Sequence, residues 1–140
     1  MSSRKDEWTL KEYGPQGSPE RWFFRKNTAP AIPVGDSAYP HLAYLTFSYS
    51  PRDESGLPSK SDEEVLFRIE DEELRDLLAD ALAVQIGAVT KNGTKDLLFY
   101  TRDPEEFLHR AAQFRSKYPQ FEVDCEVSED PRWSQYDDLP

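Results

Sequence analysis

Tyr100 and Arg102 are two side chains whose types and spacing could bind an anion together. Residues two apart on a strand point to the same face of a sheet, so both groups would reach one site. A guanidinium pairs well with carboxylate or phosphate, and a phenol hydroxyl can donate a further hydrogen bond. With Glu70 or Thr90 beside them, these residues could line a small cavity in a protein that binds an anionic ligand, or in an enzyme. Aromatic residues on such sheets also stack RNA bases, but acids on the neighbouring strand would repel RNA.

A row of carboxylates near the C-terminus could form a docking surface. The segment "FEVDCEV" alternates strictly, which is typical of a half-buried strand. Phe121, Val123, Cys125 and Val127 would point inward, and Glu122, Asp124 and Glu126 outward. We expect this row, together with the acidic first helix, to dock onto a basic protein partner. As an alternative, the acids would imitate phosphates in an immunity-type inhibitor of a toxin or nuclease.

Residue patterns that usually perform catalysis or bind metals are sparse. His41 and His109 stand outside metal-binding motifs, and Cys125 falls among inward positions, as a structural thiol would. The acidic segment 70–74 lacks the pattern of a calcium loop, so we interpret it as a solvated helix face. No glycine-rich phosphate loop is present. We therefore expect a binding or regulatory protein rather than an enzyme, with no catalytic residues, cofactor or metal.

Charge and composition narrow the class of partner. The 140 residues include 27 acids and 17 basic residues, for a net charge of -10. Residues 1–40 carry +1 and residues 41–140 carry -11. Such acidity repels nucleic acid, no apolar run is long enough to span a membrane, and the first ten residues lack the apolar core of a signal peptide. The single cysteine excludes an internal disulfide. A cytoplasmic location follows as the expectation.

The order of elements predicts an α+β fold. Residues 1–40 should form a β-hairpin and a proline-rich extended connector that pack on the same single domain. From residue 41 to 140 the patterns run strand, helix, strand, strand, helix, strand, which is the ferredoxin-like βαββαβ unit. This predicts a four-stranded antiparallel sheet with both helices on one face. The other face would be left to solvent, to the hairpin, or to a second copy in a homodimer.

Local signals predict where these elements begin and how they pair. Ser61 and Glu64 would form a capping box for the first helix, and Asp103 would cap the second. An Asn-Gly turn at 92–93 favours a two-residue hairpin. The predicted hairpin pairs are Lys91 with Thr94, Ala88 with Leu97 and Ile86 with Phe99, which would put Val84 and Ile86 on the core face and Gln85 on the face of Tyr100.

The C-terminal segment "EDPRWSQYDDLP" carries two large aromatic residues. Asp130 could cap a short helical turn that starts at Pro131, with Trp133 and Tyr136 on the same side. Burying each ring would contribute about 2 kcal/mol. We therefore expect the tail to pack back on the domain, near the N-terminal aromatic residues Trp8, Trp22 and Phe23.

Several motifs in a fixed order resemble one family. The segments are "SGLPS", "IEDEEL", "IGAVTKNGTKDLLFYTRDPEE" and "EDPRWSQY", and together they are similar to the bacterial domain-of-unknown-function 695 (DUF695) family over about residues 7–136. The resemblance implies no assigned activity; a more distant similarity in fold to the ribonuclease E regulator B family suggests regulation through protein binding. Matched positions are Trp8, Gly56, Leu57, Pro58, Glu70, Thr90, Gly93, Tyr100, Asp130, Pro131, Trp133 and Tyr136.

Overall fold

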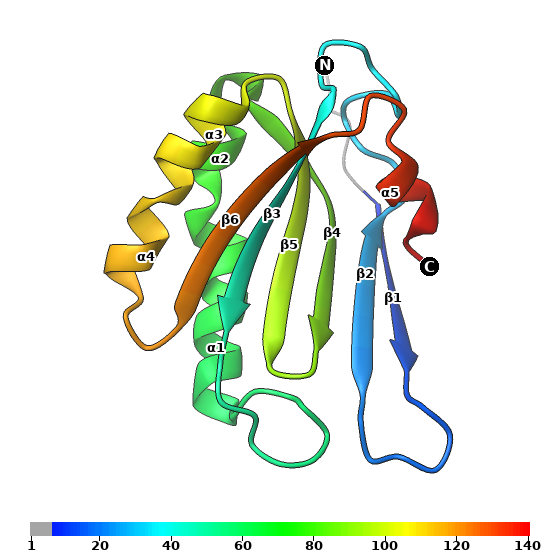
Figure 1. The fold of residues 1–140 in the computed structure, drawn as a ribbon, viewed down its shortest axis with the longest axis vertical. Helices are drawn as coiled ribbons and strands as arrows, with labels where there is room; N and C mark the ends of the chain where they lie inside the picture. The colour runs from blue at the N-terminus through cyan, green and yellow to red at the C-terminus, as the bar shows by residue number, and fades with distance from the viewer. Residues whose placement is uncertain (1–6) are drawn as a thin grey trace.

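The chain folds into one mixed α+β structure built on a single six-stranded antiparallel sheet (Figure 1). The structure is a computed structural model that describes residues 7–140, so the first six residues of the predicted 1–40 segment lie outside it. Along the sheet the strand order is β1-β2-β4-β5-β3-β6. The strands are β1 (Trp8–Tyr13), β2 (Trp22–Asn27), β3 (His41–Ser48), β4 (Ala83–Lys91), β5 (Thr94–Thr101) and β6 (Glu122–Glu129).

The N-terminal hairpin is part of this sheet. A four-stranded sheet with an added hairpin was predicted, but β2 pairs with the edge of β4, Phe23 opposite Thr90 and Arg25 opposite Ala88. β4 therefore becomes an interior strand, and six strands form one continuous sheet. The pairing hides an edge that would otherwise present unpaired backbone groups.

Helices cover one face of the sheet, called here the helical face; the opposite face is called the open face (Figure 1). Of the two predicted helix caps, one was wrong and one is confirmed. The first helix begins two residues earlier than predicted, because Ser59 rather than Ser61 is the N-cap and accepts the amide of Asp62 at 3.2 Å. Asp103 caps the second helix as predicted, accepting the amide of Glu106 at 3.1 Å. The helical-face elements are α1 (Lys60–Arg68), the π-helical turn η1 (Ile69–Glu73), α2 (Arg75–Leu78), the 3-10 turn η2 (Ala79–Ala81), α3 (Pro104–Ala111) and α4 (Gln113–Lys117).

A β-bulge in β4 changes the predicted hairpin faces. The pairs Lys91–Thr94 and Ala88–Leu97 form as predicted. Beyond them Gln85 pairs with Phe99, and Ile86 is the extra residue between Gln85 and Gly87. Because one residue is inserted, each side chain on the N-terminal side of the bulge points to the face opposite to the predicted one. Val84 and Ile86 thus join the open-face cluster with Tyr100, and the prediction that they share a face with Phe99 is wrong.

The tail packs on the open face, which confirms that it docks on the domain. α5 (Ser134–Asp138) lies against the sheet beside β2 (Figure 1). Trp133 is fully buried, and its Nε1 donates to the carbonyl of Tyr39 at 2.9 Å. The Tyr136 hydroxyl donates to the carbonyl of Asn27 at 2.7 Å. The predicted neighbours were wrong. The register of the hairpin turns Trp8 and Phe23 toward cavities on the helical face, and the Trp22 ring instead lies 4.3 Å from the Lys91 ammonium.

Candidate functional site

The predicted docking acids lie together on the open face. Glu122, Asp124 and Glu126 are exposed on the edge strand β6. Thr46 of β3 pairs in register with Asp124 of β6 on one side and with Asp96 of β5 on the other. Asp96 therefore extends the row of acids across three strands. We call Asp96, Glu122, Asp124 and Glu126 the acidic strip.

Negative charge in the acidic strip is poorly compensated. Asp96 is half-buried, and its carboxylate accepts the hydroxyl of Thr46 at 2.6 Å. Burial, and then the charge of Glu126, raise the pKa of Asp96, while the Thr46 hydrogen bond lowers it. The strip's one ion pair among residues 7–140 joins exposed Arg115 and Asp124 at 4.0 Å. An exposed pair at this distance contributes little, so the strip stays strongly negative.

Tyr100 and Arg102 do not meet around a cavity. Tyr100 is fully buried on the open face, and its hydroxyl donates to Asp130 at 2.6 Å. Burial is the largest cause of a strongly raised Tyr100 pKa, so this hydroxyl stays protonated. β5 ends at Thr101, and the Arg102 guanidinium instead donates to the carbonyl of Asp80 at 3.1 Å. Glu70 lines a cavity on the helical face, and neither Tyr100 nor Arg102 is among its lining residues.

Two glycines of the family motifs join a loop to a hairpin turn. The amide of Gly93 donates to the carbonyl of Gly56 at 3.0 Å. Gly56 has a φ of 79°, and a Cβ atom there would lie 3.1 Å from backbone atoms of Asn92. Only glycine allows both the left-handed backbone and the close approach. Leu57 and Pro58, the next two residues of the same loop, line the wall of a cavity.

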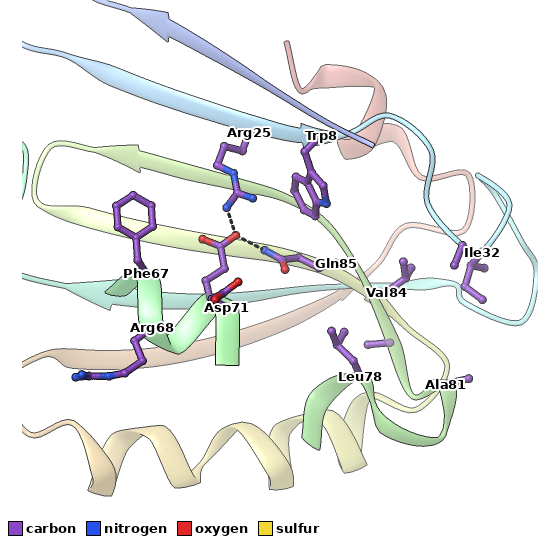
Figure 2. A pocket seen from close by; sticks show the side chains of 13 residues that line it. Trp8, Arg25, Ile32, Phe67, Arg68, Asp71, Leu78, Ala81, Val84 and Gln85 are labelled. Carbon is purple, nitrogen blue, oxygen red and sulfur yellow. Dashed lines mark hydrogen bonds and ion pairs between the residues drawn. The ribbon is translucent and has the colours of Figure 1, made fainter. Parts of the chain in front are cut away.

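Glu70 is buried at the centre of a cleft between the helices and the hairpin. Its carboxylate accepts from Arg25 and, at 2.9 Å, from the side-chain amide of Gln85; Figure 2 shows both donors turned toward one carboxylate. The Lys95 ammonium lies 3.0 Å from the other carboxylate oxygen. Burial alone would raise the pKa of Glu70, but Lys95 and Arg25 lower it below its usual range. Glu70 is therefore a buried carboxylate held ionised by two cations.

Two backbone irregularities aim side chains at this cleft. The π-helical turn Ile69–Glu73 carries Glu70, and the bulge in β4 turns Gln85 to the helical face. Such features are frequent at functional sites because they re-aim side chains. The interpretation of segment 70–74 as a solvated helix face was wrong for Glu70, whose side chain is only 7% exposed. Gly87 inside a strand pattern was the available signal for the bulge.

Arg25 lines two cavities, and Glu70 lines the first of them. One, of about 680 Å³, is lined by Trp8, Ile32 and Leu78 among others (Figure 2). The second, of about 440 Å³, lies between the hairpin, the loop before α1, and α1 itself, with Thr90 in its wall. Among residues 7–140, no three His, Cys, Asp or Glu side chains are grouped as metal ligands would be.

Comparison with known proteins assigns the chain to a family. Residues 20–139 match the model of a family described as Family of unknown function (DUF695). The chain belongs to the DUF695 family. This confirms the resemblance found in the sequence, and the matched range contains the acidic strip and most of the cleft, with Trp8 and Leu10 before it. No curated protein and no solved structure matches, so the similarity to the ribonuclease E regulator B family stays a prediction.

Within residues 7–140 of this DUF695 protein, no helix has the length and apolar character needed to cross a membrane.

Proposed function

We propose that this protein is a non-catalytic binding module that docks its acidic strip onto a basic surface of a protein partner. The observation that carries the proposal is Asp96, a half-buried carboxylate beside Glu126 with no ion-pair partner among residues 7–140. A carboxylate in this position costs free energy in the isolated protein. A lysine or arginine from a partner would offset that cost on binding.

The position of the strip suits docking. β6 is an edge strand, so its acids are reached without moving any other element. Half-buried Tyr44 pairs in register with Glu126 and offers an aromatic anchor within the strip. Opposite charges on the two proteins would speed their encounter. The first helix was expected to share this surface, but α1 covers the helical face, so the proposal uses the strand acids and Asp96 instead.

We also propose that β3 to β6 and their helices form a ferredoxin-like unit. Within the sheet these strands run in the order β4-β5-β3-β6, and all neighbours are antiparallel. The helices between β3 and β4 and between β5 and β6 lie on one face. Both features match the arrangement expected of a βαββαβ unit. The hairpin would then be an addition at the β4 edge.

An immunity-type inhibitor of a toxin or nuclease is a second candidate. Its support is the regular spacing of the strip, because alternate residues of a strand recur about every 7 Å on one face. A row of carboxylates at such a spacing could occupy a groove that binds a nucleic-acid backbone. This candidate requires that the purified protein inhibit its target nuclease, whereas the docking module need only bind.

We also infer a basic partner rather than a second copy of this chain, and a cytoplasmic location. A homodimer through the open face would bring two acidic strips together, and their like charges would repel. In addition, α5 already covers part of this face. The strip therefore favours a basic partner over a second copy. We place the protein in the cytoplasm, where the single thiol of Cys125 would stay reduced.

Affinity capture with two matched variants tests the docking proposal. The strip variant is E122K/D124K/E126K, and the control is E54K/E64K/E72K, which changes the net charge equally at three other exposed acids. We expect wild type and control to retain the same basic protein from native lysate, and the strip variant to lose it. Retention should fall in high salt, because exposed charges are screened. A partner kept equally by all three proteins would contradict the proposal.

A further inference from the structure

We propose that the cavity of about 440 Å³ beneath the N-terminal hairpin binds a small organic acid with one carboxylate and an apolar body. We call it the hairpin cavity. The acidic strip lies on the open face and this cavity on the helical face, so either proposal can fail without the other. The volume lies within the range of pockets that enclose small molecules.

The walls of the hairpin cavity are mostly apolar and come from four strands, one helix and the loop before that helix. β1 and β2 contribute one wall, β4 and β5 the floor, and α1 with the loop before it the other wall. The register of β2 on β4 sets Phe23 beside Thr90 and Arg25 beside Ala88, so all four face the cavity. An apolar ligand body would contact Leu10, Phe23, Leu57, Pro58, Leu66 and Phe67.

The charged groups in the wall favour an anion. Arg25, Arg52 and Lys95 line the cavity, against the single acid Glu63. This excess of cations stands out in a protein with a net charge of -10. Electrostatic complementarity therefore selects a negative ligand group at this point of an otherwise acidic molecule.

Lys95 and Arg25 retain donors that a carboxylate could use. Lys95 is only 6% exposed, and its ammonium lies 4.8 Å above the ring of Phe67 and 3.0 Å from Glu70. Arg25 contacts the same carboxylate. An ammonium has three N–H donors and a guanidinium five, so one carboxylate shared by both leaves several donors and one net positive charge. A second carboxylate, with the Thr90 hydroxyl in the same wall, would complete the pairing.

The charge balance also defines the ligand class. One uncompensated positive charge suits a monoanion better than a phosphate, which carries more charge and needs a more polar wall. The apolar surfaces around it suit an aliphatic or aromatic body. Medium-chain fatty acids and arylalkanoic acids have both properties.

Titration calorimetry and amide chemical-shift mapping with octanoate and 3-phenylpropionate test the proposal. Each acid is compared with its amide, which has nearly the same shape and no charge. We expect shifts at Leu57, Thr90 and Lys95, and affinity at least about tenfold higher for the acids than for the amides. Equal affinity for acid and amide, shifts confined to the open face, or no binding by the folded protein at millimolar acid would overturn the proposal.

Variants at the cavity mouth separate binding from folding. Leu10 is 63% exposed and lines the cavity, while Thr9 beside it is exposed and points to the other face of β1. L10E therefore places a negative charge at the mouth, and T9E makes the same charge change elsewhere. We expect L10E to weaken octanoate binding by about tenfold or more and T9E to leave it unchanged. K95M should weaken the acids but not the amides; equal binding by L10E and T9E would contradict the assignment.

Discussion

The indole of Trp133 stacks on the ring of Tyr100, with centroids 4.2 Å apart and planes inclined by 1°. The two residues are 33 positions apart in the chain, and their contact fixes the C-terminal segment to the open face of the sheet. Trp133 adopts a left-handed backbone with φ of 57°, which costs free energy for a residue with a side chain. The buried stack and the Nε1 hydrogen bond offset this cost.

Replacing Trp133 with alanine should destabilise the protein by about 3–5 kcal/mol, because a large buried ring is lost and a cavity is left. Chemical denaturation followed by circular dichroism would measure the change. The neighbouring exposed Arg132→Ala is the control, with an expected effect within about 0.5 kcal/mol. A stability of Trp133→Ala equal to that of the control would show that the tail does not hold the sheet.

Acid should weaken the attachment of the tail through Asp130. Its carboxylate accepts the hydroxyl of Tyr100 at 2.6 Å and the amides of Ser134 and Gln135 at 2.9 and 3.0 Å. Burial would raise the pKa of Asp130, but these hydrogen bonds lower it below its usual value. A carboxylate with a lowered pKa stabilises the fold above its unfolded pKa, and this contribution is lost as the pH falls through the folded pKa.

Asp130→Asn tests this pH dependence. Near neutral pH we expect it to destabilise the protein by about 1–3 kcal/mol, because the charge-assisted hydrogen bonds weaken. The difference from wild type should be constant above about pH 5 and shrink as the pH falls below about 4. Denaturation curves at several pH values give both quantities. A difference that grows in acid would reverse the expected sign.

Glu70→Gln should be among the more destabilising single changes on the helical face. It leaves Arg25 and the buried Lys95 without their shared carboxylate, and breaking a buried pair in this way costs about 3–5 kcal/mol. Glu72→Gln, at an exposed position of the same π-helical turn, is the control. The double variant E70Q/K95M should recover part of the loss, since it removes the unpaired ammonium. No recovery would mean that Glu70 acts mainly through Arg25 and Gln85.

The thiol of Cys125 should react slowly in the folded protein. Burial is the main cause that raises its pKa to about 11, and the charge of Arg115 only partly opposes it. Because the thiolate is the reactive form, its fraction at pH 8 should be about two orders of magnitude lower than in the unfolded chain. Reaction with Ellman's reagent, with and without denaturant, measures the ratio. Equal rates in both conditions would show that β6 leaves the thiol accessible.

Features encoded by neighbouring residues were predictable from the sequence. The Asn92-Gly93 turn, the cap at Asp103 and the alternation of β6 all depend on backbone preferences within a few residues, and each forms as predicted. The docking of the tail was also predictable, because two large rings so close together gain much free energy from burial. The alternation of β6 also placed its exposed acids correctly on the outward side of the strand.

Tertiary structure decided where these elements meet. Glu70 is buried because Arg25, 45 residues away, and Lys95 from β5 reach it, and no local pattern around Glu70 announces those partners. The bulge at Ile86 reversed the faces of Val84 and Gln85, and the hairpin's register turned Trp8 away from the tail. Sequence periodicity defines which residues share a side of one element. Which side meets which partner depends on contacts between residues far apart in the chain, and those form only when the whole sheet assembles.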